Sequence, residues 1–308
     1  MIFHAMELEF LLIDVFTDRH FGGSPLYLFP DAGQIPERTM QMLANELGFG
    51  ETAFIVSSGS GGERRSGLRV FTPAAEIPFG GHSVLGATFG LDLLGVRKSG
   101  DKDLPFTWEL EAGQYQITTR QEDGLSIYSL AQDAPVFLGQ YFHRKKVART
   151  LGISEDEIAI TGLPCEVIST GLPIHIVPLG SMDAMEQINL RRRDADAIAR
   201  DIGFGDLFVF TCETINEGST VHCRMFAPHF GIPEDPASGA ATGALIAYLV
   251  KHRLIKFTDQ VRIVSEQGLE MGRPSRLIAE AKVFEGRATS VHVGGSCVAM
   301  GSGRIVVP

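Results

Sequence analysis

Apolar residues recur along the chain in two kinds of pattern. Short aliphatic and aromatic runs, such as Leu8–Phe16 and Thr52–Val56, predict buried strands. Longer stretches with apolar residues at helical spacing, such as Pro36–Leu47, predict helices. In chain order the pattern predicts strands at 8–16, 26–29, 52–56, 67–71, 106–110, 115–119, 126–130, 166–177 (two strands and a turn), 206–210, 219–223, 260–265, 277–283 and 290–293, and helices at 36–47, 82–94, 144–151, 190–202 and 238–250.

Two of the predicted helices are unusual. The segments His82–Leu94 and Ser238–Val250 are rich in alanine, glycine and leucine, and both are apolar around most of their circumference. A helix of that kind is best buried inside a strongly curved sheet rather than laid on one face of an open one. We therefore expect an α+β protein with two halves, each a rolled sheet around a central helix.

A repeated segment leads into each of these helices. The copies Arg69–Ser83 and Arg224–Ser238 share the pattern Arg-x-Phe-x-Pro-x-x-x-Ile-Pro and begin 155 positions apart. Upstream of each copy, Pro25 and Pro173 occupy similar strand-turn-strand segments 148 positions apart. Because the two offsets nearly agree, the pattern predicts a duplicated chain.

The length of 308 residues, about twice a common domain size, also suits two units. We place the N-terminal half at 1–133 and the C-terminal half at 134–289, with the last strand, about 290–308, as a candidate for completing the N-terminal half. Two such halves facing each other would bring the two repeat loops to a shared cleft, which is where small-molecule sites tend to lie.

Composition narrows the function classes. The chain is 44% hydrophobic and 21% charged, and no run reaches the roughly 20 apolar residues of a membrane span. The first residues lack a signal-peptide pattern, so we expect a cytoplasmic protein without a membrane partner. A net charge of −10 without a basic stripe argues against nucleic acid. The four cysteines are widely spaced, which indicates neither a disulfide framework nor a zinc site.

Each repeat ends at a predicted helix N-terminus preceded by small residues. The amides at such an end have no partner within the helix, and they face the positive end of the helix dipole, so both ends suit the carboxylate of a substrate. The alternative is structural: the glycines permit close packing, and the two serines are ordinary N-caps. The candidate binding residues in the two loops are Gly81, Ser83, Ser238, Gly239 and Ala240.

Three residues could carry acid/base chemistry. Glu51 stands beside the apolar strand Thr52–Val56, and an apolar surrounding favours proton transfer by a carboxyl group. Its alternative reading is an exposed loop carboxylate. His82 could shuttle a proton or only cap its helix, and Asp235 would ordinarily be a turn residue. The place of Asp235 in the repeat is what makes it a candidate.

At these residues the chain resembles a known family. Gly50–Phe54, the two repeat copies and Glu266–Ser275 are similar in order to the PhzF (phenazine biosynthesis-like) family. The resemblance implies a diaminopimelate epimerase-like fold with two pseudo-symmetric halves and an active site in the cleft between them. It also implies cofactor-independent isomerisation, usually by a homodimer. Glu51, His82 and Asp235 would stand at the positions of the family's catalytic glutamate, histidine and aspartate.

Two departures from related proteins bear on the chemistry. The family's usual Gly-Asn-Pro is Gly23-Ser24-Pro25 here, so Ser24 becomes the candidate for any substrate contact made by the asparagine. The related cysteine-dependent racemases place a cysteine in each repeat loop. Neither loop holds one here, so a two-thiol mechanism lacks its bases.

The sequence therefore predicts an isomerase that moves a proton within a small carboxylate-bearing metabolite. No dinucleotide fingerprint, phosphate-binding loop or cluster of metal ligands is present in the sequence, so we expect neither a cofactor nor a metal. Two alternatives remain open. One is an epimerase with bases other than cysteine, and the other is a small-molecule binding protein without catalysis.

Overall fold

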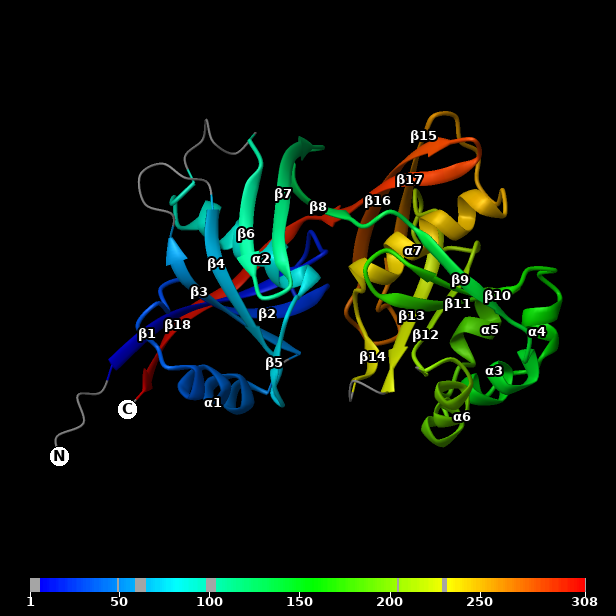
Figure 1. Ribbon diagram of the computed structural model, residues 1–308, viewed down its shortest axis with the longest axis horizontal. Helices are drawn as coiled ribbons and strands as arrows, with labels where there is room; N and C mark the ends of the chain where they lie inside the picture. The colour runs from blue at the N-terminus through cyan, green and yellow to red at the C-terminus, as the bar shows by residue number, and fades with distance from the viewer. Residues whose placement is uncertain are drawn as a thin grey trace. The chain divides into compact units, whose positions relative to one another are not determined.

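The chain divides into two compact units (Figure 1). Unit 1 comprises Met1–Ala131 and Gly294–Pro308, and unit 2 comprises Gln132–Val293. The computed structural model describes residues 6–48, 50–58, 65–97, 104–203, 205–228 and 232–307. Within these ranges, no helix is both long enough and apolar enough to cross a membrane. The prediction of an α+β fold with two halves, each a sheet with a central helix, is confirmed.

Unit 1 is a mixed sheet in the order β18, β1, β2, β3, β4, β6, β7, β8. The β2–β3 and β4–β6 pairs are parallel and the others antiparallel, while the short β5 pairs with the last residues of β4. Its elements are β1 (Met6–Val15), β2 (Ser24–Phe29), α1 (Glu37–Leu47), β3 (Glu51–Ser58), β4 (Arg65–Phe71), β5 (Glu76–Ile77), α2 (Gly81–Leu93), β6 (Phe106–Leu110), β7 (Gly113–Glu122), β8 (Leu125–Gln132) and β18 (Cys297–Val307).

The last strand of the chain lies beside the first. In Figure 1 the red strand β18 runs along the blue strand β1, and the antiparallel pairing extends from Met6 with Val307 to Val15 with Cys297. A bulge between Leu12 and Ile13 shifts its register. Unit 1 is thus completed by residues from the opposite end of the sequence.

Unit 2 repeats this strand order as β9, β10, β11, β12, β13, β15, β16. The β11–β12 and β13–β15 pairs are parallel, and the short β14 pairs with the end of β13. Its elements are β9 (Val136–Tyr141), α3 (Arg144–Leu151), α4 (Asp156–Ala159), β10 (Cys165–Ser169), β11 (Pro173–Pro178), α5 (Met182–Glu186), α6 (Arg192–Ile202), β12 (Leu207–Thr211), β13 (Val221–Ala227), β14 (Ile232–Asp235), α7 (Gly239–Lys251), β15 (Gln260–Gln267), β16 (Ser275–Phe284) and β17 (Arg287–Gly295).

Each unit buries one helix against its own sheet. In α2 nearly every residue from Ser83 to Leu91 is buried, and in α7 every residue from Ala241 to Val250. A Cβ atom added at Gly86 of α2 would lie 2.5 Å from the side chain of Leu26 on β2. The small residues therefore let the helix and the strand approach closely. The helices lack a polar face because they are buried on nearly all sides.

The repeated segment forms the same arginine cluster in both units. Arg69 on β4 binds both carboxylate oxygens of Glu76, at 2.7 and 2.5 Å, and its guanidinium lies 5.3 Å from the centre of the Phe71 ring. Arg224 on β13 binds both oxygens of Glu234, at 2.8 and 2.9 Å, and lies 5.0 Å from the ring of the phenylalanine two positions later. This repetition confirms that the two segments are structurally related.

Part of the sequence alignment of the repeats is nevertheless wrong. The two arginines are 155 positions apart, but Glu76 and Glu234 are 158 apart, as are the first residues of α2 and α7. In the strand pairing, Ile77 faces Val70 in unit 1, whereas Asp235 faces Met225 in unit 2. The connection in the second copy is three residues longer, so the Ile-Pro match does not join equivalent positions. Residues 229–231 of this connection lie outside the described ranges.

Candidate active site

The carboxylate of Glu51 lies at the N-terminus of α2. Glu51 is the first residue of β3 and pairs with Leu26 in the parallel β2–β3 ladder. Its Oε2 atom accepts a hydrogen bond of 2.5 Å from the hydroxyl of Ser83, in the first turn of the helix. The unpaired amides and the positive dipole end of a helix stabilise a negative charge at this position. The structure thus brings Glu51 together with the first repeat loop.

His82 belongs to the same cluster. Its Nε2 atom lies 3.5 Å from Oε2 of Glu51, and the exposed fractions of the two side chains are 14% and 17%. This nitrogen is buried, and within the described ranges no atom forms a hydrogen bond with it. A buried ring nitrogen without a partner is costly in a folded protein. This ring nitrogen therefore has a hydrogen-bonding capacity that no described protein atom satisfies.

Gly80 is what allows this close contact. Gly80 is the N-cap of α2, and a Cβ atom at this position would overlap Oε2 of Glu51. Ser83 stands three residues later, so the structural alternative in which Ser83 is an ordinary N-cap is wrong. Its hydroxyl binds the carboxylate instead. Gly80 was not singled out in the sequence, although its place in the loop before Gly81 could have suggested a close approach.

In unit 2, Asp235 begins a tight turn into α7. Its Oδ1 atom accepts a hydrogen bond of 3.2 Å from the amide of Ala237, which makes the carboxylate part of the turn. Ser238 is the N-cap of α7, but its side chain makes no capping hydrogen bond. Gly239 and Ala240 are the first two residues of the helix, where amides lack partners within the helix. Unit 2 therefore also presents a helix N-terminus beside an acidic residue.

The two units differ in what surrounds the equivalent positions. Strand pairing makes Asp206, immediately before β12, the counterpart of Glu51, because Thr52 and Leu207 face the equivalent phenylalanines of β4 and β13. Asp206 is only 6% exposed. The counterparts of His82 and Ser83, however, are the second and third residues of α7, and both are alanines. Only unit 1 therefore holds the combination of glutamate, histidine and serine.

Ser24 lies on β2, the strand that pairs with the strand of Glu51. It is the first residue of β2, pairs with Val15, and is 5% exposed. It precedes by two positions the residue of β2 that pairs with Glu51. The predicted site residues thus fall into two local groups. Unit 1 contains Glu51, His82, Gly81, Ser83 and Ser24, and unit 2 contains Asp235, Ser238, Gly239 and Ala240.

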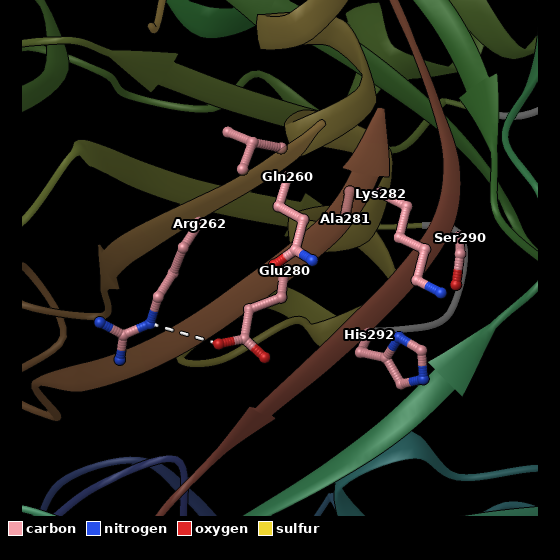
Figure 2. Close-up of a pocket in the computed structure, with 8 residues that line it drawn as sticks. Gln260, Arg262, Glu280, Ala281, Lys282, Ser290 and His292 are labelled. Carbon is pink, nitrogen blue, oxygen red and sulfur yellow. Dashed lines mark ion pairs between the residues drawn. The ribbon is translucent and has the colours of Figure 1, made fainter. Parts of the chain in front are cut away.

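One open cavity of about 450 Å³ lies in unit 2. It extends along β15, β16 and β17 of unit 2, and Figure 2 shows its charged side chains, with Arg262 and Glu280 forming an ion pair of 3.5 Å. None of the predicted site residues lines it. Its walls are formed by Gln260, Val261, Arg262, Glu280, Ala281, Lys282, Ser290 and His292.

The arrangement of titratable side chains does not suggest a metal centre. Among the residues with described positions, no three side chains of histidine, cysteine, aspartate or glutamate are grouped as metal ligands. The group in unit 1 combines the carboxylate of Glu51, the imidazole of His82 and the hydroxyl of Ser83. A carboxylate, an imidazole and a hydroxyl at a helix N-terminus can bind a small anion and move a proton.

Comparisons of the sequence identify relatives over nearly the whole chain. A family model described as phenazine biosynthesis-like protein matches residues 13–303. The trans-2,3-dihydro-3-hydroxyanthranilate isomerase of Pseudomonas fluorescens is 32% identical over 301 residues, which cover 97% of this chain and 99% of the relative. An uncharacterized isomerase of Bacillus subtilis is 30% identical over 293 residues, which cover 95% of this chain and 96% of the relative.

Solved structures share the fold. A PhzF-family phenazine biosynthesis protein from Bacillus anthracis matches with a TM-score of 0.89 at 25% identity, over 98% of this chain and 100% of that one. A hydroxyproline epimerase from Agrobacterium vitis matches in fold, with a TM-score of 0.59 at 12% identity, over 98% and 93% of the two chains. The family resemblance seen in the sequence is confirmed. The chain belongs to the phenazine biosynthesis-like (PhzF) family and is an isomerase.

Proposed function

We propose that this isomerase moves a proton between two carbons of a small carboxylate-bearing metabolite, with Glu51 as the general acid/base and without a cofactor. The observation that carries the proposal is the contact of Glu51 with Ser83 and His82 at the N-terminus of α2. A positioned carboxylate can take a proton from one carbon and return it to another. Such a transfer is redox-neutral, so it needs no oxidant or reductant.

The neighbours of Glu51 have distinct roles in this scheme. The hydroxyl of Ser83 holds Oε2 of Glu51 in place, so that the other carboxylate oxygen can face the substrate. The unpaired Nε2 of His82 binds a polar group of the substrate and helps to move protons. The amide of Gly81, at the start of α2, supports a negative charge on the substrate. Ser24 is the proposed further polar contact from β2.

Unit 2 is proposed to contribute Asp235 and the N-terminus of α7. The turn that holds the Asp235 carboxylate precedes a helix end whose amides suit a substrate carboxylate. Ser238, Gly239 and Ala240 are the proposed binding residues there. This assignment is supported by the repeat, because the equivalent helix end in unit 1 holds the catalytic cluster.

The first substrate to test is trans-2,3-dihydro-3-hydroxyanthranilate, which is named for relatives of this chain. The name describes a cyclohexadiene ring with a carboxylate, an amino group and a hydroxyl. Ring C–H groups next to the double bonds of such a molecule are the ones a base can deprotonate. The molecule therefore belongs to the substrate class that the site suits: small, cyclic, unsaturated and anionic.

An epimerase with two carboxylate bases is the second candidate. Asp206 favours it, since this residue occupies the position in unit 2 that Glu51 occupies in unit 1. The two alanines that replace His82 and Ser83 in unit 2 argue against it, because the second helix end has no counterpart of this histidine and serine. We therefore favour a single base, Glu51, which returns the proton to the substrate.

The test is conversion of trans-2,3-dihydro-3-hydroxyanthranilate in deuterated buffer, followed by NMR spectroscopy and mass spectrometry. We expect a product in which the ring double bonds have moved relative to the substrate. A stereoisomer of the substrate with unchanged double bonds would support the epimerase. Binding of the compound without either reaction would contradict both and favour a binding protein.

A further inference from the structure

The side chain of Gln267 spans the turn that contains Asp235. Gln267 is the last residue of β15 and is completely buried. Its Nε2 atom donates a hydrogen bond of 2.7 Å to the carbonyl of Asp235, and its Oε1 atom accepts one of 3.3 Å from the amide of Ser238. One primary amide thus holds the backbone on both sides of Pro236-Ala237. A carboxylate of the same size would lack the donor, and an aliphatic side chain would lack both groups.

The residues after Gln267 hold the same turn from a second side. Gly268 has a φ of +75°, and a Cβ atom there would lie 2.7 Å from the carbonyl oxygen of Pro236. The hydroxyl of Ser275 donates a hydrogen bond of 2.7 Å to this same oxygen. Both the conformation and the close contact exclude side chains larger than hydrogen at position 268. The segment from Gln267 to Ser275 therefore supports the turn by contacts with the backbone of the turn.

A buried charge cluster fixes the position of Gln267. His222 on β13 is fully buried, and its ring nitrogens lie 2.9 Å from a carboxylate oxygen of Glu266 and 2.8 Å from one of Glu270. Because both acceptors are carboxylates, both ring nitrogens are donors and the ring is an imidazolium. In the parallel β13–β15 ladder, His222 pairs with Glu266 and Cys223 with Gln267.

Other groups complete this cluster. Glu266 also accepts hydrogen bonds from the amides of Ile215 and Asn216, at 2.6 and 2.9 Å, and from the side-chain amide of Asn216 at 2.8 Å. The cation of Arg224 acts on Glu270 through space. Every hydrogen-bonding atom of Glu266 and His222 is therefore in use, and a satisfied buried network of this kind fixes one arrangement of the strands.

We propose that Gln267 is a positioning residue for Asp235 and the N-terminus of α7, and that His222, held between Glu266 and Glu270, keeps Gln267 in place. The proposal rests on the function proposed above, in which Asp235 serves the reaction. Gln267 touches no substrate. It acts by fixing the backbone that carries the Asp235 carboxylate and presents the Ser238 and Gly239 amides.

The first test is a double-mutant cycle. Gln267→Leu should lower kcat/KM for trans-2,3-dihydro-3-hydroxyanthranilate by about 10–100-fold, the usual effect of losing hydrogen bonds to buried groups. In an Asp235→Asn background the same change should cost about 2-fold or less, because the group that it positions is already disabled. Gln260→Leu, at the exposed first position of the same strand, is the matched control and should keep wild-type activity. An equal loss in both backgrounds would overturn the proposal.

The second test does not depend on activity. Hydrogen exchange measured by NMR should show the Ser238 amide exchanging about 10-fold faster or more in Gln267→Leu than in wild type or in Gln260→Leu. Gln267→Glu keeps the acceptor for Ser238 but loses the donor to Asp235, so it should protect this amide and still lower kcat/KM. If the wild type fails to convert trans-2,3-dihydro-3-hydroxyanthranilate, the proposed function fails. The exchange rates alone then test whether Gln267 positions the turn that contains Asp235. Unchanged protection of the Ser238 amide in Gln267→Leu would overturn the proposal that Gln267 is a positioning residue. If Gln267→Leu does not fold, an undiminished kcat/KM in Gln267→Glu would overturn the same proposal.

Discussion

The hydroxyl of Ser83 donates a hydrogen bond of 2.5 Å to the carboxylate of Glu51, which joins the first turn of α2 to the first residue of β3. The two residues are far apart in the sequence and come together because β3 and β4 are antiparallel neighbours and the chain turns from β4 through β5 into the helix. The contact occupies one carboxylate oxygen and orients the group.

Ser83→Ala should therefore slow catalysis without abolishing it. A hydrogen bond to a charged group contributes about 1.5–3 kcal/mol, so we expect kcat to fall by about 10–100-fold. Steady-state kinetics would measure this loss. Ser302→Ala, at an exposed position of β18, is the control and should leave kcat unchanged. Wild-type kcat in Ser83→Ala would show that the contact does not orient the catalytic group.

Gly80→Ala should displace the Glu51 carboxylate, because its Cβ atom would overlap Oε2. We expect kcat/KM to fall by about 10-fold or more, since small misplacements of a catalytic group are costly. Gly50→Ala is the matched control. It adds the same methyl group beside Glu51 in the sequence, but at a point where, among the described residues other than its chain neighbours, no atom lies within 4 Å. Comparable kinetics for the two variants would contradict the close contact.

The buried His222 should make stability depend on pH. Burial alone would lower its pKa, but the hydrogen bonds to Glu266 and Glu270 outweigh burial and raise the pKa to about 9, from 6.5 for a free histidine. The folded state therefore holds a proton that the unfolded state releases above pH 6.5. The contribution of His222 to stability is complete below about pH 6.5 and is lost as the pH rises through 9.

Denaturant unfolding at pH 6, 7.5 and 9 would measure this effect. For one proton the free energy of unfolding should fall by about 1.4 kcal/mol per pH unit between 6.5 and 9. At pH 6 the free energy of unfolding of His222→Gln should be lower than that of the wild type. This difference should become smaller as the pH rises towards 9. Parallel pH curves for the two proteins would show that His222 does not carry the proton.

Much of the fold could be predicted from the pattern of apolar residues. The helices α2 and α7 stand out because glycine and alanine replace the usual polar face, and the strands around them follow from short apolar runs. The strands β9 and β18 were harder to recognise. In β9, Val136 and Leu138 are exposed, and β18 contains Gly301 and Gly303, so neither strand has the apolar run of a buried strand.

The candidate site could be predicted only in part. Glu51, His82 and Asp235 were found because they stand in or near a repeat that resembles a known family. Gly80 and Gln267 were missed because their importance depends on contacts between distant segments. Gln267 lies within the motif Glu266–Ser275, but nothing in the sequence shows that its amide reaches the backbone of Asp235. The three-residue difference between the repeats was also hidden by a chance Ile-Pro match.

The resemblance to the family further predicts a homodimer. Light scattering at micromolar concentration should give about twice the chain mass of 33.4 kDa. Dilution to nanomolar concentration would show whether the association is tight. A single species of the chain mass at both concentrations would contradict this prediction.

The central claim is that Glu51 transfers the proton, and Glu51→Gln tests it most directly. The amide keeps the size of the side chain and can still accept the hydrogen bond from Ser83, but it cannot act as a base. With trans-2,3-dihydro-3-hydroxyanthranilate in deuterated buffer, the initial rate of isomerisation should fall by about 10²–10⁴-fold, while calorimetry should show that the compound still binds. A Glu51→Gln protein that folds, binds the compound and isomerises it at the wild-type rate would contradict the account.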